Sequence, residues 1–282
     1  MMLDAKQLTR IIEAALAEDV NTGDITTLST VPEGTQIEGR FLAKASGLIC
    51  GVSVAQAVFA HVDPAIRLEF FFGDGDRIQK GDVIARIGGP AIPILTCERL
   101  ALNLMQHMSG IATRTREAVE MVAGYPVRIL DTRKTTPGLR MLEKYAVRVG
   151  GGHNHRFTLS DGVLIKDNHI QAAGGITKAI RAARLHAPHT LKIEVETEML
   201  EQVREALSAG ADIIMLDNMS TELMAQSVKL IGKRALVEAS GNMDEKDLRE
   251  VAATGVDFIS VGALTHSVHP LDISLKLAAK PL

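Results

Sequence analysis

Hydrophobic and polar positions in the first part of the chain alternate with two different periodicities, one typical of helices and one typical of strands. Residues 4–18 and 96–123 carry apolar side chains at helical spacing, which predicts an opening amphipathic helix and a later long helix or helix pair. Residues 36–89 combine short apolar runs with glycine-aspartate turns, as strands and hairpins do, with one helix near 52–61. Residues 18–27 are rich in Asp, Asn and Gly and predict a loop. These elements indicate a first α+β domain.

After Tyr125 the pattern changes to short apolar runs that are separated by helical segments. The runs cover residues 127–130, 163–165, 191–195, 212–216, 235–239 and 257–261. Helical patterns lie between most of them, for example at 176–186, 198–209 and 244–253. Six strands alternating with helices predict parallel βαβ units, which either close into a barrel or open into a sheet.

Each of these runs ends in a polar residue or a glycine. The end positions are Asp131, Lys166, Glu196, Asp217, Ser240-Gly241 and Gly262. Because the carboxyl ends of the strands in a parallel α/β barrel converge on one rim, these residues are expected to build a site together.

Bulk properties narrow the class of protein. The chain has 282 residues, which suggests about two domains, and a formal net charge of −3, which gives no general reason to expect nucleic acid or an anionic membrane as partner. No apolar run is long enough to span a bilayer, and the first residues lack the pattern of a signal peptide. Cys50 and Cys97 lie in apolar settings and are predicted to be buried thiols, so the expected compartment is the cytoplasm.

Basic residues are concentrated between Arg128 and Lys166. Arg133 and Lys134 follow a predicted strand and precede a Thr-Thr-Pro-Gly turn, and Lys166 directly follows the apolar run at 163–165. The same region also contains His153, His155, Arg156 and, just beyond it, His169. Arginine binds carboxylates or phosphates through two hydrogen bonds and lysine acts as a point charge, so the pattern predicts a small, multiply anionic ligand.

Carboxylates and glycines at the other strand ends predict a second ligand. Glu196 and Asp217 can hold Mg2+ or sugar hydroxyls, while Glu194 is expected to point the same way but deeper. Backbone N–H groups of Ser240-Gly241-Asn242 and Gly262-Ala263 stand where barrels commonly bind phosphate. The combination suits a phosphorylated sugar that meets an anionic acceptor.

The same residues give weaker support for three other functions: a zinc site, a Schiff-base lyase and a non-catalytic sensor. His153 and His155 could form part of a zinc site, but no cysteine or acid adjoins them and Arg156 would repel the metal. Lys166 could instead form a Schiff base in a lyase, and the whole rim could belong to a non-catalytic sensor of an anionic metabolite. The sequence contains no phosphate loop of the GxxxxGKS type and no GxGxxG after a strand.

Several motifs together resemble the quinolinate phosphoribosyltransferase family, in the family's order and over nearly the whole chain. They are EDVNTGDITT, CERLALNLMQHMSGIAT, DTRKTTPGLRMLEKYAVRVGGGHNHR, LSDGVLIKDNH, IEVE, MLDN, VEASGN and ISVGALTHS. The resemblance implies transfer of phosphoribosyl from phosphoribosyl pyrophosphate to quinolinate, with loss of CO2. Related enzymes that use nicotinate or a pyrimidine, or a homologue associated with molybdenum uptake, are the nearest alternatives.

The resemblance also implies an architecture. The fold would be α/β, with an N-terminal α/β sandwich (residues 1–112, joined by the C-terminal tail 266–282) and an incomplete parallel α/β barrel (residues 113–265). The enzyme would be a homodimer, or a hexamer built as a trimer of dimers, in which Arg99 enters the neighbouring subunit's site.

Finally, the resemblance assigns roles to individual residues. Arg133, His155, Arg156 and Lys166, with Thr132 beside them, would bind quinolinate. The phosphoribosyl pyrophosphate would be bound by Lys134, Glu196, Asp217, Ser240, Gly241, Asn242 and Gly262. Lys134, Lys166, Glu196 and Asp217 would act in catalysis, and Mg2+ would be held mainly by the pyrophosphate donor, with Glu196 and Asp217 as candidate ligands. Asn242 stands where many family members have glycine.

Overall fold

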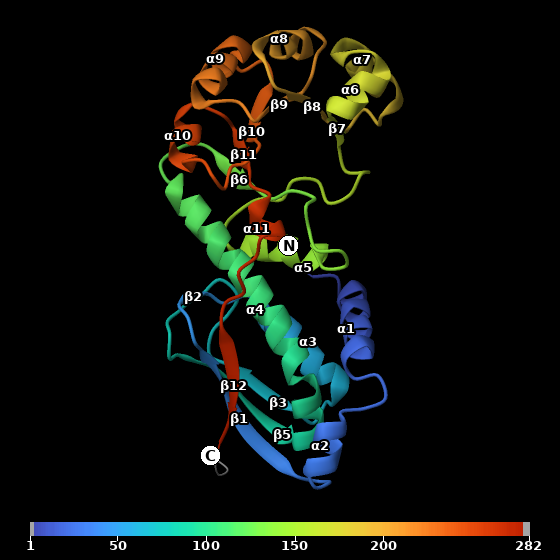
Figure 1. Cartoon of the computed structure of the whole chain (residues 1–282), viewed down its shortest axis with the longest axis vertical. Coiled ribbons are helices and arrows are strands. Elements are labelled where there is room, and N and C mark those ends of the chain that lie inside the picture. The colour runs from blue at the N-terminus through green and yellow to red at the C-terminus, as the bar shows by residue number, and fades with distance from the viewer. Residues whose placement is uncertain (1–2, 279–282) are drawn as a thin grey trace. The chain divides into compact units, whose positions relative to one another are not determined.

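The protein divides into two compact units in a computed structural model that describes residues 3–278 (Figure 1). The first unit comprises the chain up to Arg114, Thr136–Gly151 and the chain from Val268 onward, and the second comprises Thr115–Thr135 and Gly152–Ser267. The sequence-based ranges 1–112 and 113–265 differ from this division mainly at residues 136–151, which pack with the first unit. Residues 1–2 and 279–282, which those ranges included, lie outside the described residues.

Segment 136–151 belongs to the first unit because of the helix it contains, α5 (Arg140–Val149). Glu143 of α5 is fully buried, accepts the backbone N–H of Thr136 and is hydrogen-bonded to His107 Nε2 at 2.9 Å. Tyr145 donates its hydroxyl to Asp74 at 2.8 Å. The sequence analysis predicted only the turn that precedes this helix.

The first unit is built on an antiparallel sheet in the order β12-β1-β5-β3. Its strands are β1 (Gln36–Ala43), β3 (Arg67–Phe70), β5 (Val83–Pro90) and β12 (Ile273–Leu277), and β2 (Gly47–Leu48) pairs separately with β4 (Arg77–Ile78). Its helices include α1 (Ala5–Asp19), α2 (Ile25–Thr30), α3 (Val52–Val62) and most of α4 (Ala91–Met121). Phe41 and Phe59 meet edge to face at 6.1 Å in its core, and Cys50 and Cys97 are buried and free, as predicted.

The predicted loop at 18–27 is wrong in its last part, since α2 begins at Ile25. Asp24 caps this helix by accepting the backbone N–H of Thr27 at 3.0 Å. The same hydrogen bonds, above all the one from the Thr27 hydroxyl, lower the pKa of the Asp24 carboxyl. The helix is short, and a six-residue segment with several β-branched threonines gives little periodic signal.

The second unit is a parallel sheet of six strands in the order β6-β11-β10-β9-β8-β7. The strands are β6 (Arg128–Leu130), β7 (Val163–Ile165), β8 (Ile193–Thr197), β9 (Ile213–Asp217), β10 (Leu236–Ser240) and β11 (Phe258–Ser260). The helices of this unit are α6 (Asp167–Ala173), α7 (Ile176–His186), α8 (Leu200–Ser208), α9 (Thr221–Ile231), α10 (Leu248–Ala253) and α11 (Ala263–His266). Helices α7, α8 and α9 lie along the outside of the strands (Figure 1).

Each of the six apolar runs is therefore a strand, and the predicted α/β class, with an antiparallel first sheet and a parallel barrel-like second one, is confirmed. Beside β6, at the edge of the sheet, His153 forms a short parallel bridge to Leu130. This bridge extends the parallel pairing by one residue pair beyond β6, although the segment around His153 is too short to count as a strand.

Side chains alternate along these strands between the helices and the barrel interior. On β8, Ile193 and Val195 are buried, as strand residues covered by helices should be, while Glu194 and Glu196 take the other face. The register pairs Glu196 and Glu238 with Met215, and Asp217 with Ser240. The interior is thus layered, and each strand presents one residue at the rim and another two positions deeper.

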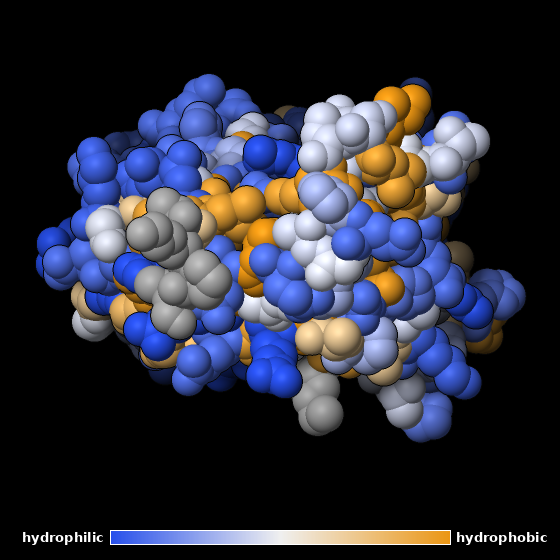
Figure 2. Space-filling view, turned by 90° about the horizontal axis from the view of Figure 1, so that it is seen from below, coloured by the Kyte–Doolittle hydropathy of each residue, from blue (hydrophilic) through white to orange (hydrophobic). Residues whose placement is uncertain are grey.

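The surface seen from below the view of Figure 1 is mostly hydrophilic, with apolar side chains in several patches (Figure 2). Large exposed apolar side chains of the first unit include Ile25 and Leu28 on α2 and Leu277 on β12. Scattered exposed apolar residues are normal on globular proteins. Within residues 3–278, no helix is both long and apolar enough to cross a membrane.

Candidate active site

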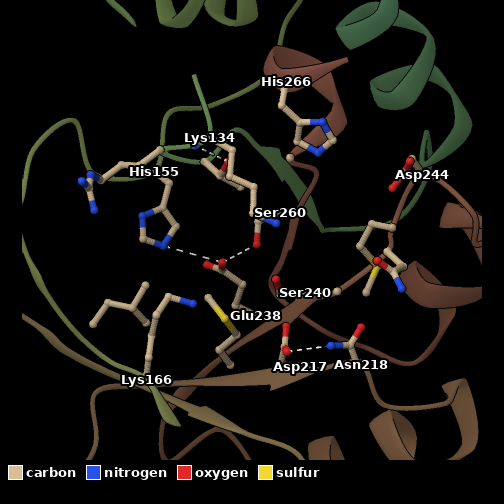
Figure 3. Close-up of a pocket in the computed structure, with 18 of the residues that line it drawn as sticks. Lys134, His155, Lys166, Asp217, Asn218, Glu238, Ser240, Asp244, Ser260 and His266 are labelled. Atoms are coloured by element: carbon tan, nitrogen blue, oxygen red, sulfur yellow. Dashed lines mark hydrogen bonds and ion pairs between the residues drawn. The ribbon is translucent and has the colours of Figure 1, made fainter. Parts of the chain in front are cut away.

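A cavity of about 450 Å3 opens at the carboxyl ends of the barrel strands (Figure 3). Eleven of the predicted site residues line it: Thr132, Arg133, Lys134, His155, Arg156, Lys166, Asp217, Ser240, Gly241, Asn242 and Gly262. Segments far apart in sequence therefore converge here because their strands are parallel and end at one rim. In Figure 3, His155 and Lys166 lie on one side of the cavity and Asp217, Asn218 and Asp244 on the other.

Two predicted residues are not among those that line the cavity. Glu196 is paired with Lys166 through its carboxylate, at the edge of the site. Arg99 is an exposed residue of α4 in the first unit and takes no part in the cavity within the chain. The proposed contribution of Arg99 to a neighbouring subunit stays a prediction.

The basic loop at 153–156 is fixed in place by a buried carboxylate. Asp131, just past β6, is fully buried and accepts the backbone N–H of His155 at 2.9 Å and the side-chain amide of Asn154 at 2.6 Å. Arg156 donates to the carbonyl of Gly162 at 3.0 Å. Asp131 thus serves the loop and not a ligand, although it occupies the first strand-end position of the predicted pattern.

The cations at this end are close enough to affect one another. Burial is the main factor that lowers the pKa of the Arg156 guanidinium, and the positive charge of Arg133 is the next. Lys166 lies on the same side of the cavity (Figure 3). An anion between like charges held together in this way would relieve their repulsion, so the charge at this end of the cavity suits a carboxylate or a phosphate.

His155 lines the cavity, and both of its ring nitrogens have protein partners. Its Nδ1 accepts the backbone N–H of Arg156 at 2.8 Å, and its Nε2 faces Glu194 at 3.1 Å. Both ring nitrogens therefore already face protein groups. The geometry gives His155 the task of supporting Arg156, and a direct ring contact with a ligand would require one of these bonds to be exchanged.

The opposite end of the cavity is shaped by close backbone packing. Gly241 has φ +90°, and a Cβ there would lie 2.2 Å from Asn218 Oδ1. Asn218 also donates to Asp217 Oδ2 at 2.8 Å, so it links the carboxylate to the loop after β10. Asn242 has φ +50°, a left-handed conformation that Gly and Asn adopt more readily than other residues, so asparagine is tolerated at this position.

Gly262 allows two more polar side chains to approach. A Cβ at Gly262 would lie 3.1 Å from His266 and 3.3 Å from the Lys134 side chain. The hydroxyl of Thr265 donates to the backbone carbonyl of Lys134 at 2.8 Å, which ties the loop after β6 to the last loop of the barrel. Lys134 and His266 consequently share one wall of the cavity (Figure 3).

Eight residues that line the cavity were not predicted from the sequence. Two of them are the apolar Leu164 and Met215. The other six are Asn218, Glu238, Met243, Asp244, Ser260 and His266. Glu238 and Ser260 stand two residues before the rim residues Ser240 and Gly262, so the alternation of a strand could have revealed them. His266 had been placed in the tail 266–282 and not considered for the site.

Comparison with known proteins gives a consistent result. Family models of the quinolinate phosphoribosyl transferase N-terminal and C-terminal domains match residues 24–109 and 111–276. A probable nicotinate-nucleotide pyrophosphorylase (carboxylating) from Bacillus subtilis is 48% identical over 269 residues, which is 95% of this chain and 93% of the relative.

Solved structures agree. NadC from Streptococcus pyogenes has a TM-score of 0.92 at 44% identity and covers 99% of both chains. The nicotinate-nucleotide pyrophosphorylase from Francisella tularensis has a TM-score of 0.92 at 39% identity and covers 98% of both. The fold and the site are those of a phosphoribosyltransferase. This chain belongs to the quinolinate phosphoribosyltransferase family, which confirms the resemblance in its motifs.

Proposed function

We propose that this enzyme transfers the phosphoribosyl group of phosphoribosyl pyrophosphate to the ring nitrogen of quinolinate and releases pyrophosphate and CO2. The product would be nicotinate mononucleotide, a precursor in NAD biosynthesis. Family membership supports this assignment, and one structural observation carries it at the site. The cavity has cations on one side and Asp217 with glycine-rich loops on the other, as a dianionic acceptor and a phosphorylated donor would need.

Arg133, Arg156 and Lys166 form the acceptor end in this proposal. Quinolinate carries two carboxylates on adjacent ring carbons, and two guanidinium forks with one ammonium supply enough donors for both. An acceptor with a single carboxylate, such as nicotinate, would leave part of this charge unmatched. The Lys166 ammonium group is paired with the Glu196 carboxylate.

The donor end consists of Lys134, Asp217 and the loops after β10 and β11. Gly241 and Gly262 permit close approach of a phosphate to backbone N–H groups, and Asp217 can accept hydrogen bonds from ribose hydroxyls. His266 adds a further polar group beside Lys134. These groups would hold the phosphoribosyl pyrophosphate with its reactive carbon toward the acceptor.

Mg2+ fits this donor set. The ion typically binds one or two carboxylates together with substrate phosphates, and Asp217, whose Oδ2 is engaged by Asn218, offers its other oxygen. Glu196, the second candidate ligand, is already paired with Lys166. When bound, Mg2+ would neutralise charge on the pyrophosphate. Asp217 is the residue of this chain that would share in holding it.

The chemistry requires two bond changes at the ring nitrogen and its neighbouring carbon. The nitrogen bonds to the ribose carbon as pyrophosphate leaves, and Lys134 can stabilise the charge that grows on the leaving group. When the adjacent C–CO2 bond breaks and CO2 departs, its electron pair stays on the ring carbon, and the neighbouring positive nitrogen stabilises this carbanion until it takes a proton from water. Arg133, Arg156 and Lys166 orient the ring, and they accelerate the reaction only as far as they support the transition state more than the bound substrates.

Oligomeric state, Arg99 and location complete the proposal. A homodimer, or a hexamer of three dimers, would bring Arg99 of one subunit to the cavity of the other, and its exposure on α4 is compatible with that role. A cytoplasmic location is supported by the two buried free cysteines, Cys50 and Cys97, because reducing compartments keep thiols free.

The direct test is to incubate the protein with Mg2+, phosphoribosyl pyrophosphate and either quinolinate or nicotinate, and to follow CO2 and mononucleotide. Arg133→Ala should raise KM for quinolinate by roughly 10- to 100-fold and leave KM for the donor nearly unchanged, because charge-assisted hydrogen bonds are lost. Lys134→Ala should do the reverse. Unchanged quinolinate kinetics in Arg133→Ala would refute the acceptor assignment.

A further inference from the structure

Three ionisable side chains from separate segments meet beneath the cavity. Nε2 of His155 lies 3.1 Å from Glu194 and 3.7 Å from Glu238, and the hydroxyl of Ser260 donates to Glu238 at 2.5 Å (Figure 3). Glu194 and Glu238 are only 4% and 2% exposed. Two carboxylates therefore occupy a dry layer of the barrel, next to one imidazole.

This layer separates two cavities. Glu238, His155 and Arg156 line both the site cavity and a second cavity of about 410 Å3 toward the amino ends of the strands. The titratable groups that line the second cavity besides these three are Arg128 from β6, His153 from the segment beside β6, Asp161 from the loop before β7, and Lys192 and Glu194 from β8 and the residues before it. In the site cavity, the cations Arg133, Lys134 and Lys166 line the same space as Glu238. The neighbours of Glu238 on the adjacent strands are Met215 of β9 and Phe258 and Ser260 of β11. Glu194 is thus the negative group nearest to Glu238.

The hydrogen bonds indicate which atoms carry protons. Because Nδ1 of His155 accepts a backbone N–H, the proton of a neutral imidazole resides on Nε2, which donates to Glu194. Glu194 is therefore the hydrogen-bond acceptor of this contact. Burial, and next the charge of Glu194, raise the pKa of Glu238 to about 8. Two ionised carboxylates here would also repel each other at short range without solvent to screen them.

We propose that Glu238 keeps a proton that it shares with Glu194, so that the floor of the acceptor site carries one negative charge instead of two. The inference rests on the proposed function, since it concerns the binding of a dianionic acceptor above this floor. Glu238 acts here as a positioning residue. It holds Glu194, which holds His155, which in turn holds the backbone of Arg156.

Loss of this proton would weaken acceptor binding. A second negative charge would lie below the carboxylates of quinolinate and partly cancel Arg133 and Arg156. It would also strengthen the pull of Glu238 on His155, 3.7 Å away, at the expense of Glu194. The donor end, built on Asp217 and the loops after β10 and β11, should be less affected.

Glu238→Gln is the decisive variant, because an amide keeps the shape and neutrality of a protonated carboxyl and can still donate to Glu194. Folded Glu238→Gln should remain active at about pH 7. Between about pH 7 and pH 9, KM for quinolinate should rise roughly tenfold more in the unsubstituted enzyme than in Glu238→Gln, because only the former gains the buried charge. KM for phosphoribosyl pyrophosphate and kcat should shift similarly in both.

Glu201→Gln is the matched control, since Glu201 is an exposed residue of α8 in a weak contact with Arg204. It should reproduce the pH profile of the unsubstituted enzyme. Identical profiles in Glu238→Gln and Glu201→Gln would overturn the proposal, as would a large loss of activity in folded Glu238→Gln at about pH 7, because that would show that the ionised form is required.

Infrared difference spectroscopy without substrates separates this inference from the proposed function. A protonated buried carboxyl should be visible at about pH 7 in the unsubstituted protein and in Glu201→Gln, and absent in Glu238→Gln. If the band is present but no quinolinate is converted, the proposed function fails and the shared proton stands. If the band is missing, or if the protein holds one metal ion that Glu238→Gln loses, the proposal is wrong, since the same three residues bring their ligand atoms within 4.8 Å of one another.

Discussion

The rim of the barrel and the layer just beneath it are built from the same strands, yet their carboxylates differ in exposure and in how their charge is compensated. At the rim, Glu196 and Asp217 are partly exposed and face lysine and asparagine side chains. Two residues deeper, Glu194 and Glu238 are buried against each other, with one imidazole and one hydroxyl as partners. Solvent can screen the rim charges, whereas the buried pair has to be neutralised by a proton. Depth, and not residue type, decides what a carboxylate does here.

The largest expected effect concerns stability in the buried layer. Because burial raises the pKa of Glu238 to about 8 from the ordinary glutamate value of 4.5, the native protein keeps this proton over a pH range in which the unfolded chain has lost it. The free energy of unfolding should therefore fall by up to about 1.4 kcal/mol per pH unit as pH rises through that range, and level off above it. Glu238→Gln should remove this slope.

Urea unfolding at about pH 5, 7 and 9 measures the slope. Glu238→Gln should gain on the unsubstituted protein by up to a few kcal/mol at the highest pH. Glu201→Gln, exposed to solvent, should show no such trend. If the difference in the free energy of unfolding between Glu238→Gln and the unsubstituted protein did not change with pH, Glu238 would not hold a proton that is lost in this range, and the buried layer would not differ from the rim.

An intermediate effect is expected at the rim where the backbone is crowded. Gly241→Ala combines a left-handed φ with a Cβ that would lie 2.2 Å from Asn218, so Asn218 has to move away from Asp217. We expect a loss of about 2 kcal/mol in the free energy of unfolding and a raised KM for phosphoribosyl pyrophosphate. Gly210→Ala is the control, because Gly210 has φ +83° and open space around it. Equal losses in both variants would show that backbone strain alone is responsible.

The smallest effect on stability is expected for Glu196→Gln at the rim. It breaks the ion pair with Lys166, whose side chain is 46% exposed, and such pairs contribute little to folding. Chemical unfolding should show a change of less than about 1 kcal/mol, although activity should fall because Lys166 loses its orientation. A loss of several kcal/mol would mean that rim charges also hold the fold together.

Much of the barrel was predictable because its strands are covered on both faces. Buried parallel strands read as continuous apolar runs, and all six were located from that pattern. The polar residues at their ends identified most of the cavity, since parallel strands end at one rim. Helix α5 was not predicted, and its Lys144 is fully buried, which is unusual for a lysine.

The inner layer was harder to predict for a physical reason. Glu238 lies inside the apolar run 235–239, and a single acid within such a run is easily taken as an exception. Its partner His155 comes from a distant loop, and the two are brought together only when Asp131 fixes that loop beside β6. Local patterns do not reveal contacts that depend on tertiary packing, and His266 on the short α11 was missed for the same reason.

The alternation of the chain between its two units has a consequence for synthesis on the ribosome. The antiparallel sheet of the first unit needs β12, which pairs with β1 through Ile273–Leu277, and the same unit also needs α5. The first unit therefore cannot be completed until residues 273–277 have been translated, which is after the last of the six parallel strands, β11. Nascent chains stalled before residue 273 should expose the free edge of β1 and need chaperone protection.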